Sequence, residues 1–182
     1  MTAPLLSDDL ITLRALEPAD AEALYLWEND TRLWNVGCAN APFSLRQLED
    51  YIAGYDADIY SARQLRLVIA EKNTGRAVGT ADIYDFDPVN QRAGIGVLVE
   101  ERQRGRGIGG RAVRLLERYA FLRLGLHQLW AVVPADNTPC REMFTQAGYR
   151  ITGCARSWVR SGHGFVDAYL YQRLNIDENL SI

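Results

Sequence analysis

Apolar residues recur along this chain at two different spacings, and the spacing predicts where helices and strands lie. Four stretches have the three-to-four-residue period of an amphipathic helix. They begin at Glu17-Pro18, at the capping-box sequence from Ser44, behind a glycine-rich turn, and at Asn137. Their apolar faces are Ala21, Leu24, Tyr25 and Trp27; Leu45, Leu48, Tyr51, Ile52 and Tyr55; Ile108, Ala112, Leu115, Leu116 and Tyr119, ending near Gly125; and Cys140, Met143, Phe144 and Ala147.

Runs rich in β-branched and aromatic residues predict strands between these helices. Turn sequences separate two pairs of them, at Lys72–Gly75 and at Ser161–Gly164. The predicted order is β-α-α-β-β-β-α-β-α-β-β. It indicates an α/β (α+β) fold whose mixed sheet is largely antiparallel, with one central β-α-β crossover. The strands are expected at residues 10–13, 66–70, 78–84, 92–99, 128–133, about 149–159 and 165–174.

Composition narrows the class of protein. A length of 182 residues suits a single domain, 1–182, with a core at about 10–174, and the net charge of −3 argues against nucleic-acid binding. No apolar run approaches the roughly 20 residues of a membrane span, and the N-terminus does not resemble a signal peptide. The three cysteines, Cys38, Cys140 and Cys154, are widely spaced, which argues against disulfides or zinc and favours a reducing cytoplasm.

The stretch from Arg102 to Arg111 reads R-Q-R-G-R-G-I-G-G-R and lies between a predicted strand and a predicted helix. Free amides at a helix N-terminus and flexible glycines make an anion site, to which Arg104 and Arg106 can add charge. We therefore expect a phosphorylated ligand. The stretch lacks the Lys-Ser/Thr of a P-loop, and its glycines and position do not fit a dinucleotide-binding fingerprint.

Arg104-x-x-Gly107-x-Gly109 resembles the (Q/R)-x-x-G-x-(G/A) motif of the GNAT superfamily of acetyl-CoA-dependent N-acetyltransferases. The flanking segments are similar to that family too: an apolar strand precedes the motif, Pro134–Asn137 follows the next strand, and Gln146–Tyr149 ends the last helix. The resemblance covers roughly residues 10–174. It is strongest to the branch of spermidine/diamine and ribosomal-protein N-terminal acetyltransferases.

The resemblance implies acetyl-CoA as cosubstrate, a primary amine as acceptor, and no metal. It further implies that the third central strand carries a bulge and splays from its neighbour. Asn137 would reach the cofactor as well as capping its helix, and Phe144 would lie beside the cofactor. The implied backbone contacts are Val97, Leu98 and Val99 for pantetheine, and Arg104, Gly105, Arg106, Gly107, Ile108, Gly109 and Gly110 for pyrophosphate.

The same resemblance suggests catalytic groups. The amide of Leu98, or that of Val99, is the expected oxyanion donor. Many relatives carry a tyrosine acid where this chain has Phe144, which has no proton to give. Cys140, on the same helix face, is the substitute donor, and packing in the core is its alternative role. Tyr149 is a further donor with the same alternative.

Carboxylates suggest the base and the acceptor. Asp85 is the candidate base, and strand alternation would put it on one face with Asp87. With Asp82, Glu28 and Asp30 these residues would form an acidic pocket for a cationic amine, unless they are solvated loop carboxylates. His163 lies in an exposed turn and is expected to be inert. Three tryptophans either line the acceptor site or belong to the core: Trp27, Trp34 and Trp158.

Three functions stay open at this point. A small di- or polyamine acceptor comes first, and a protein N-terminal α-amine comes second. Because Phe144 replaces the tyrosine acid, a CoA-binding module with little catalysis is the third. The expected partners are thus a small amine or a peptide N-terminus, without nucleic acid or membrane. Homo-oligomers occur among relatives and are carried over only as an expectation.

Overall fold

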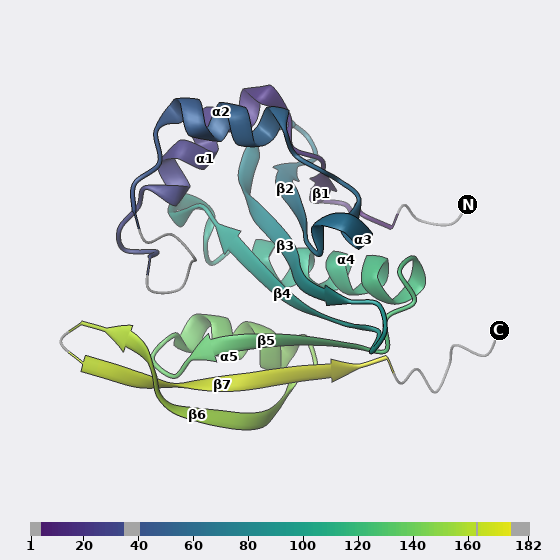
Figure 1. The fold of residues 1–182 in the computed structure, drawn as a ribbon, viewed down its shortest axis with the longest axis vertical. Coiled ribbons are helices and arrows are strands. Elements are labelled where there is room, and N and C mark those ends of the chain that lie inside the picture. Colours follow the sequence, from purple (N-terminus) through teal and green to yellow (C-terminus); the bar gives the residue numbers. More distant parts are fainter. Residues whose placement is uncertain (1–4, 35–40, 163, 176–182) are drawn as a thin grey trace.

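The computed structural model describes residues 5–34, 41–162 and 164–175. These residues build a seven-stranded sheet with the strand order β1-β2-β3-β4-β5-β7-β6 (Figure 1). The strands are β1 (Ile11–Arg14), β2 (Leu65–Glu71), β3 (Ala77–Asp87), β4 (Arg92–Val99), β5 (Gln128–Pro134), β6 (Arg150–Ser161) and β7 (Gly164–Leu174). The helices are α1 (Ala21–Glu28), α2 (Leu45–Ala53), α3 (Ile59–Ala62), α4 (Ile108–Leu122) and α5 (Thr138–Gln146), with 3₁₀ turns at Pro18–Asp20 and Glu101–Gln103.

The mixed, largely antiparallel sheet expected from the sequence is confirmed. Only β4 and β5 pair in parallel within the described sheet, and α4 is the crossover between them. The described elements follow the predicted order with one addition, the single-turn α3. Four residues are too few to show a helical period, so the sequence pattern does not reveal this helix.

Local signals set the helix starts. Ser44 Oγ accepts the Gln47 amide of α2 while Gln47 Oε1 accepts the Ser44 amide, as the capping-box pattern predicts. Asn137 caps α5 by accepting the Cys140 amide on its side-chain oxygen. By contrast, α4 begins at Gly107, whose φ is 75°, and no side-chain cap is present there. The two predicted side-chain caps are therefore real, and α4 starts differently.

Two layers of helices bury the two faces of the sheet (Figure 1). Residues of α4 and α5 pack on one face, with Val97 and Val99 of β4. Residues of α1 and α2 form a separate cluster on the other face, with Leu98. Because neighbouring residues of a strand point to opposite faces, this alternation shows that β4 lies between both layers.

The sheet divides between β4 and β5. Their ladder joins Arg92–Gly94 to Gln128–Trp130 and stops there, although both strands continue. The backbone of β4 from Ile95 to Val99 is therefore not paired with β5, which confirms the expected splay. The expected bulge in β4 is wrong: its register with β3 is regular from Val99 back to Gly94. The irregularity lies instead on β3 between Tyr84 and Asp87, because Asp85 adopts a φ of 49°.

Candidate active site

The glycine-rich loop joins the splayed end of β4 to α4. Gly105 and Gly107 both have φ of 75°, a left-handed conformation that glycine adopts at little cost. A side chain at either residue would meet nothing within 4 Å, so the backbone here is open on that side. The first amides of α4, on Ile108, Gly109 and Gly110, have no carbonyl partner within the helix. The loop is thus able to bind a pyrophosphate through its main chain.

The arginines of this stretch are mostly committed to protein partners. Arg104 Nε donates to the Val99 carbonyl at 3.0 Å, which ties the loop to the end of β4. Arg106 pairs with Glu71 at 3.2 Å, and Arg111 pairs with Asp8 at 2.8 Å. Charge from these side chains is therefore partly neutralised within the protein, and the backbone amides of the loop stay the predicted anion-binding groups.

At Leu98 the strands β3 and β4 approach unusually closely. A Cβ added to Gly79 of β3 would lie 2.0 Å from the Leu98 carbonyl oxygen. That carbonyl therefore leans over Gly79 without any slip in register between the two strands. Because the C=O and N–H of a trans peptide point in opposite directions, the Val99 amide points away from β3, and Val99 is the better placed of the two expected oxyanion donors.

The face of α5 carries the candidate acid. Asn137 Oδ1 lies 3.2 Å from the Cys140 amide nitrogen, so this oxygen is used in capping. Burial raises the pKa of the Cys140 thiol to about 11, which keeps it protonated at neutral pH. Phe144 is 2% exposed and packs on Tyr149 and Tyr171, with ring centroids 5.0 and 5.9 Å away. Phe144 is a core residue here, and its predicted contact with the cofactor stays a prediction, as does Asn137's.

On the α1–α2 side, Arg66 of β2 lies between two carboxylates. Its guanidinium contacts Asp82 of β3 at 2.6 Å and Glu28 of α1 at 2.9 Å. Burial raises the pKa of Asp82 above its usual range, although the charge of Arg66 opposes the shift. Asp82 is in register with Gly96, on the part of β4 that has left β5. Two carboxylates and one guanidinium leave one net negative charge beside the splayed strand.

The remaining carboxylates do not join this cluster. Asp87 accepts the amides of Val89 and Asn90 in the β3–β4 turn, and the Asn90 amide is the main reason that its pKa is lowered. The bulge breaks the alternation that was expected to put Asp85 and Asp87 on one face. Asp85 is exposed on the bulge. Asp30 pairs with Arg32, so the five-carboxylate pocket is wrong as a whole, and only Glu28 and Asp82 come together.

An aromatic pair at the point of splay is absent from the sequence expectations. Tyr84 and Trp130 form an edge-to-face contact with ring centroids 5.1 Å apart. The Tyr84 ring lies across Gly94, where an added Cβ would come within 2.3 Å of it. The signal for this close approach is the pair Gly94 and Gly96, two residues apart on one face of a strand. The pair closes the end of the splay where β4 and β5 last touch.

The tryptophans and the other candidates occupy varied places. Trp27 is buried between α1 and α2, and Trp34 Nε1 donates to the Glu28 carbonyl. Trp158 is 67% exposed on β6. Tyr149 is 3% exposed in the core. His163 and Cys38 lie outside the described residues.

Over residues 5–34, 41–162 and 164–175, no three His, Cys, Asp or Glu side chains are grouped so that they could hold a metal ion. In that same part of the chain, no helix is long and apolar enough to cross a membrane.

The sheet, its splay and the glycine-rich loop together define an acetyltransferase fold, and a family comparison agrees. The model of the acetyltransferase (GNAT) domain matches residues 11–150. The chain therefore belongs to the GNAT acetyltransferase family, and it is an acetyl-CoA-dependent acyltransferase.

Curated relatives are distant but cover most of the chain. An uncharacterized N-acetyltransferase, p20, of Bacillus licheniformis is 27% identical over 168 residues, which is 90% of this chain and 92% of p20. Spermidine N(1)-acetyltransferase of Escherichia coli K12 is 22% identical over 143 residues, covering 79% and 74%. The "Putative ribosomal N-acetyltransferase YdaF" of Bacillus subtilis is 28% identical over 150 residues, covering 80% and 81%.

Solved structures have the same fold. The crystal structure of a "Probable acetyltransferase" superposes with a TM-score of 0.81 at 26% identity, covering 96% of this chain and 97% of that one. Spermidine N-acetyltransferase from Vibrio cholerae, in complex with CoA and spermine, gives 0.79 at 19% identity, covering 92% and 96%.

Proposed function

We propose that this enzyme transfers the acetyl group of acetyl-CoA to the primary amine of a small di- or polyamine. The supporting observation is the cluster of Glu28, Arg66 and Asp82, which leaves one net negative charge beside Gly96. A carboxylate-rich site attracts an ammonium group and orients it before it loses its proton. The spermidine acetyltransferases among the relatives act on acceptors of this class.

Acetyl-CoA fits the residues present. The open loop at Gly105 and Gly107 and the first amides of α4 would hold its pyrophosphate, with the amide of Arg106 beside them. The Arg104 amide, also expected there, instead donates to the Glu101 carbonyl at 3.2 Å. The unpaired edge of β4 at Val97, Leu98 and Val99 would hold the pantetheine arm as an added strand would be held. When bound, acetyl-CoA supplies the activated thioester.

Acetyl transfer needs three chemical groups from the chain: a base, an oxyanion donor and an acid. The acceptor amine must lose a proton to become nucleophilic, and Asp85 is the proposed acceptor of that proton. The Val99 amide, which points away from β3 because the Leu98 carbonyl of the same peptide faces Gly79, would donate to the carbonyl oxygen of the acetyl group as negative charge develops on it. As the C–N bond forms and the C–S bond breaks, the protonated thiol of Cys140 would donate to the leaving sulfur, and the second proton lost by the acceptor nitrogen would return to Cys140.

A protein N-terminal α-amine is the second candidate acceptor. Similarity to the Bacillus subtilis ribosomal N-acetyltransferase candidate favours it, at 28% identity over 150 residues. An N-terminal ammonium also carries a single positive charge, which matches the single net negative charge of the cluster. A CoA-binding module with little catalysis is the third alternative.

We also propose that the chain forms one domain over 1–182 and acts in the cytoplasm. The free thiols of Cys140 and Cys154 fit a reducing compartment. A homo-oligomer is an expectation carried by the relatives, one of which is described as dodecameric.

The test is release of free thiol from acetyl-CoA in the presence of spermidine, putrescine or short peptides with varied N-termini. We expect turnover with the small amines and none with peptides. A Glu28→Gln variant should raise KM for a cationic amine, since it removes the one net negative charge of the cluster while Asp82 keeps its partner Arg66. Turnover with peptides alone would replace the polyamine acceptor, and CoA binding without any turnover would favour the binding module.

A further inference from the structure

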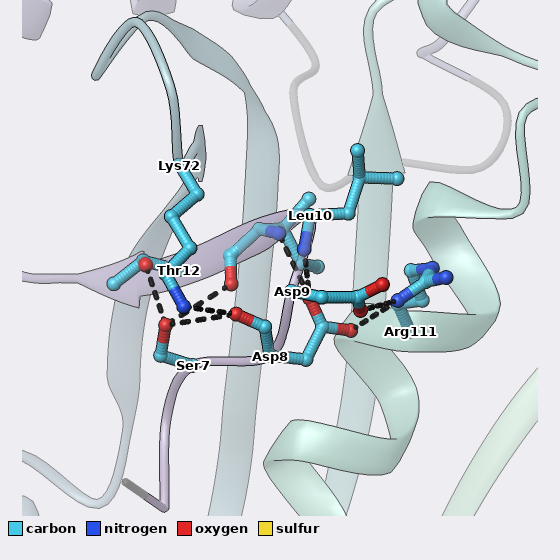
Figure 2. A network of polar contacts seen from close by, with 8 residues as sticks. Ser7, Asp8, Asp9, Leu10, Thr12, Lys72 and Arg111 are labelled. Carbon is cyan, nitrogen blue, oxygen red and sulfur yellow. Dashed lines mark hydrogen bonds and ion pairs between the residues drawn. The ribbon is translucent and has the colours of Figure 1, made fainter.

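Arg111, near the start of α4, pairs with two carboxylates near the N-terminus of the chain. Arg111 lies one turn inside α4, and its NH1 contacts the carboxylates of both Asp8 and Asp9 (Figure 2). Residues 6–13 form a folded segment before and within β1, here called the N-terminal hook. The hook thus contacts the helix whose first amides face the proposed pyrophosphate site.

The hook is held rigidly by its own hydrogen bonds. Asp8 Oδ1 accepts the amides of Leu10 and Ile11, each at 2.8 Å, while its other oxygen, Oδ2, accepts Arg111 NH1 at 2.8 Å. Ser7 and Thr12 hydroxyls lie 2.9 Å apart across the turn (Figure 2). Ile11 is fully buried in the core beneath α4. A single carboxylate therefore joins a fixed part of the sheet edge to the first turn of α4.

A second contact anchors the hook to the β2–β3 hairpin. The Lys72 amide donates to the Leu10 carbonyl at 2.9 Å, and Lys72 Nζ donates to the Asp8 carbonyl. Burial by itself would raise the pKa of Asp8. The Ile11 amide, Arg111 and the Leu10 amide together hold that pKa below its usual range. The Asp8 carboxylate therefore stays charged at neutral pH and remains paired with Arg111.

These carboxylates offset an unfavourable charge interaction at the start of α4. A cation in the first turn is unfavourable next to the positive end of the helix dipole, and no acidic residue lies in the first turn of α4. The usual remedy is a Ser, Asp or Glu cap, which would occupy the very amides that a phosphate needs. Carboxylates supplied by the hook stabilise Arg111 from the side and leave those amides free.

We propose that Asp8 is a positioning residue for cofactor binding, which holds the first turn of α4 and its phosphate-binding amides in place through Arg111. The proposal rests on the proposed use of acetyl-CoA. Asp9 contributes less, since its side chain is 81% exposed whereas that of Asp8 is 22% exposed. The Asp8–Arg111 ion pair can change the affinity for CoA by no more than its own free energy of interaction. An ion pair at the protein surface is therefore expected to change Kd by roughly fivefold at most.

The test measures the Kd for CoA by titration calorimetry, together with KM for acetyl-CoA and kcat, in wild type and variants. Asp8→Asn keeps the oxygen that accepts Leu10 and Ile11 but loses its charge. We expect its Kd for CoA and its KM for acetyl-CoA to rise about fivefold, with kcat at saturation unchanged. Removing a negative charge near a phosphate site would by itself tighten binding, so simple electrostatics predicts the opposite sign.

Matched variants distinguish loss of the Asp8–Arg111 ion pair from a general loss of stability. Arg111→Lys should bind CoA like wild type, because a single terminal nitrogen of Arg111 makes both ion pairs. Arg111→Met should weaken binding as Asp8→Asn does, and the double variant should lose no more than either single one. Arg123→Met removes an exposed arginine from the other end of α4 and should leave the Kd unchanged.

Wild-type or tighter CoA binding by a folded Asp8→Asn variant would overturn the positioning role while leaving the proposed function intact. If Arg111→Met fails to fold, Asp8→Asn and Arg111→Lys decide the question. Failure of the wild-type protein to bind CoA would remove the proposed function, and the positioning role with it.

Discussion

Gly79 is a position where the structure leaves no room for a larger residue. A Cβ at this position would lie 2.0 Å from the Leu98 carbonyl oxygen, while real Cβ contacts are not shorter than 3.0 Å. The backbones of β3 and β4 would therefore have to separate by about 1 Å in Gly79→Ala, the difference between these two distances. No flexible side chain is available to move instead, because the obstructing atom belongs to the main chain.

The cost of Gly79→Ala follows from two opposing effects. Overpacking in a close-packed region destabilises by about 1–3 kcal/mol, whereas replacing a strand glycine with alanine recovers about 0.5–1 kcal/mol of chain entropy. We expect a net loss of about 1–2 kcal/mol, which for a chain of this size lowers Tm by roughly 2–8 °C. A shift of about 1 Å of the Leu98–Val99 peptide, whose amide is the proposed oxyanion donor, should also lower kcat, by up to about 100-fold.

Thermal unfolding and acetyl-CoA turnover measure both effects, and Gly153→Ala is the matched control. Gly153 is also a strand glycine, but its added Cβ would make an ordinary 3.7 Å contact with Leu170. The control should keep its activity, and the recovered chain entropy should raise its Tm by about 1–4 °C. If Gly79→Ala behaves like Gly153→Ala in both assays, the close approach at Leu98 does not constrain the fold or the reaction.

Three further outcomes are expected. Gly107→Glu should abolish CoA binding measured by calorimetry, because it places a strained left-handed side chain and a negative charge at the phosphate loop; unchanged affinity would exclude the loop from the site. Iodoacetamide at pH 7.5 should label exposed Cys154 before Cys140, whose thiol has a pKa of about 11, and peptide mass spectrometry will show whether the order is reversed. Burial raises the pKa of Glu117 from 4.5 to about 7, so its contribution to stability is present below pH 4.5 and is lost as the pH rises through 7. Tm of Glu117→Gln relative to wild type should therefore increase between pH 5 and 8, and a constant difference would contradict the shifted pKa.

The fold was largely predictable because its signals are local. The Ser44 capping box, the Asn137 cap and the glycine-rich loop each fix an element boundary through residues within a few positions of one another. The strand 92–99 was predicted with its observed bounds, since its apolar run ends where the loop begins. The short α3 was not predicted, because a single helical turn is too short to show a hydrophobic period.

The site was less predictable because its partners are distant in sequence. The cluster combines Glu28 of α1, Arg66 of β2 and Asp82 of β3. The spacing of the carboxylates in the sequence does not indicate that an arginine lies between two of them. Alternation failed at Asp85, where one bulged residue reverses the faces that follow. The Asp8 contact with Arg111 spans 103 positions, so only the folded chain reveals it.

Charge in this protein therefore has two separate uses. Composition alone suggests that the arginines of residues 102–111 exist to bind a phosphorylated ligand. Two of them are instead paired with carboxylates, Arg106 with Glu71 at the end of β2 and Arg111 with Asp8 of the hook, and Arg104 ties the loop to β4. In the proposed mode of binding, backbone amides would meet the ligand, and these ties would hold them in place. A basic residue beside a glycine-rich loop can thus serve binding by holding the loop's geometry as well as by attracting the anion.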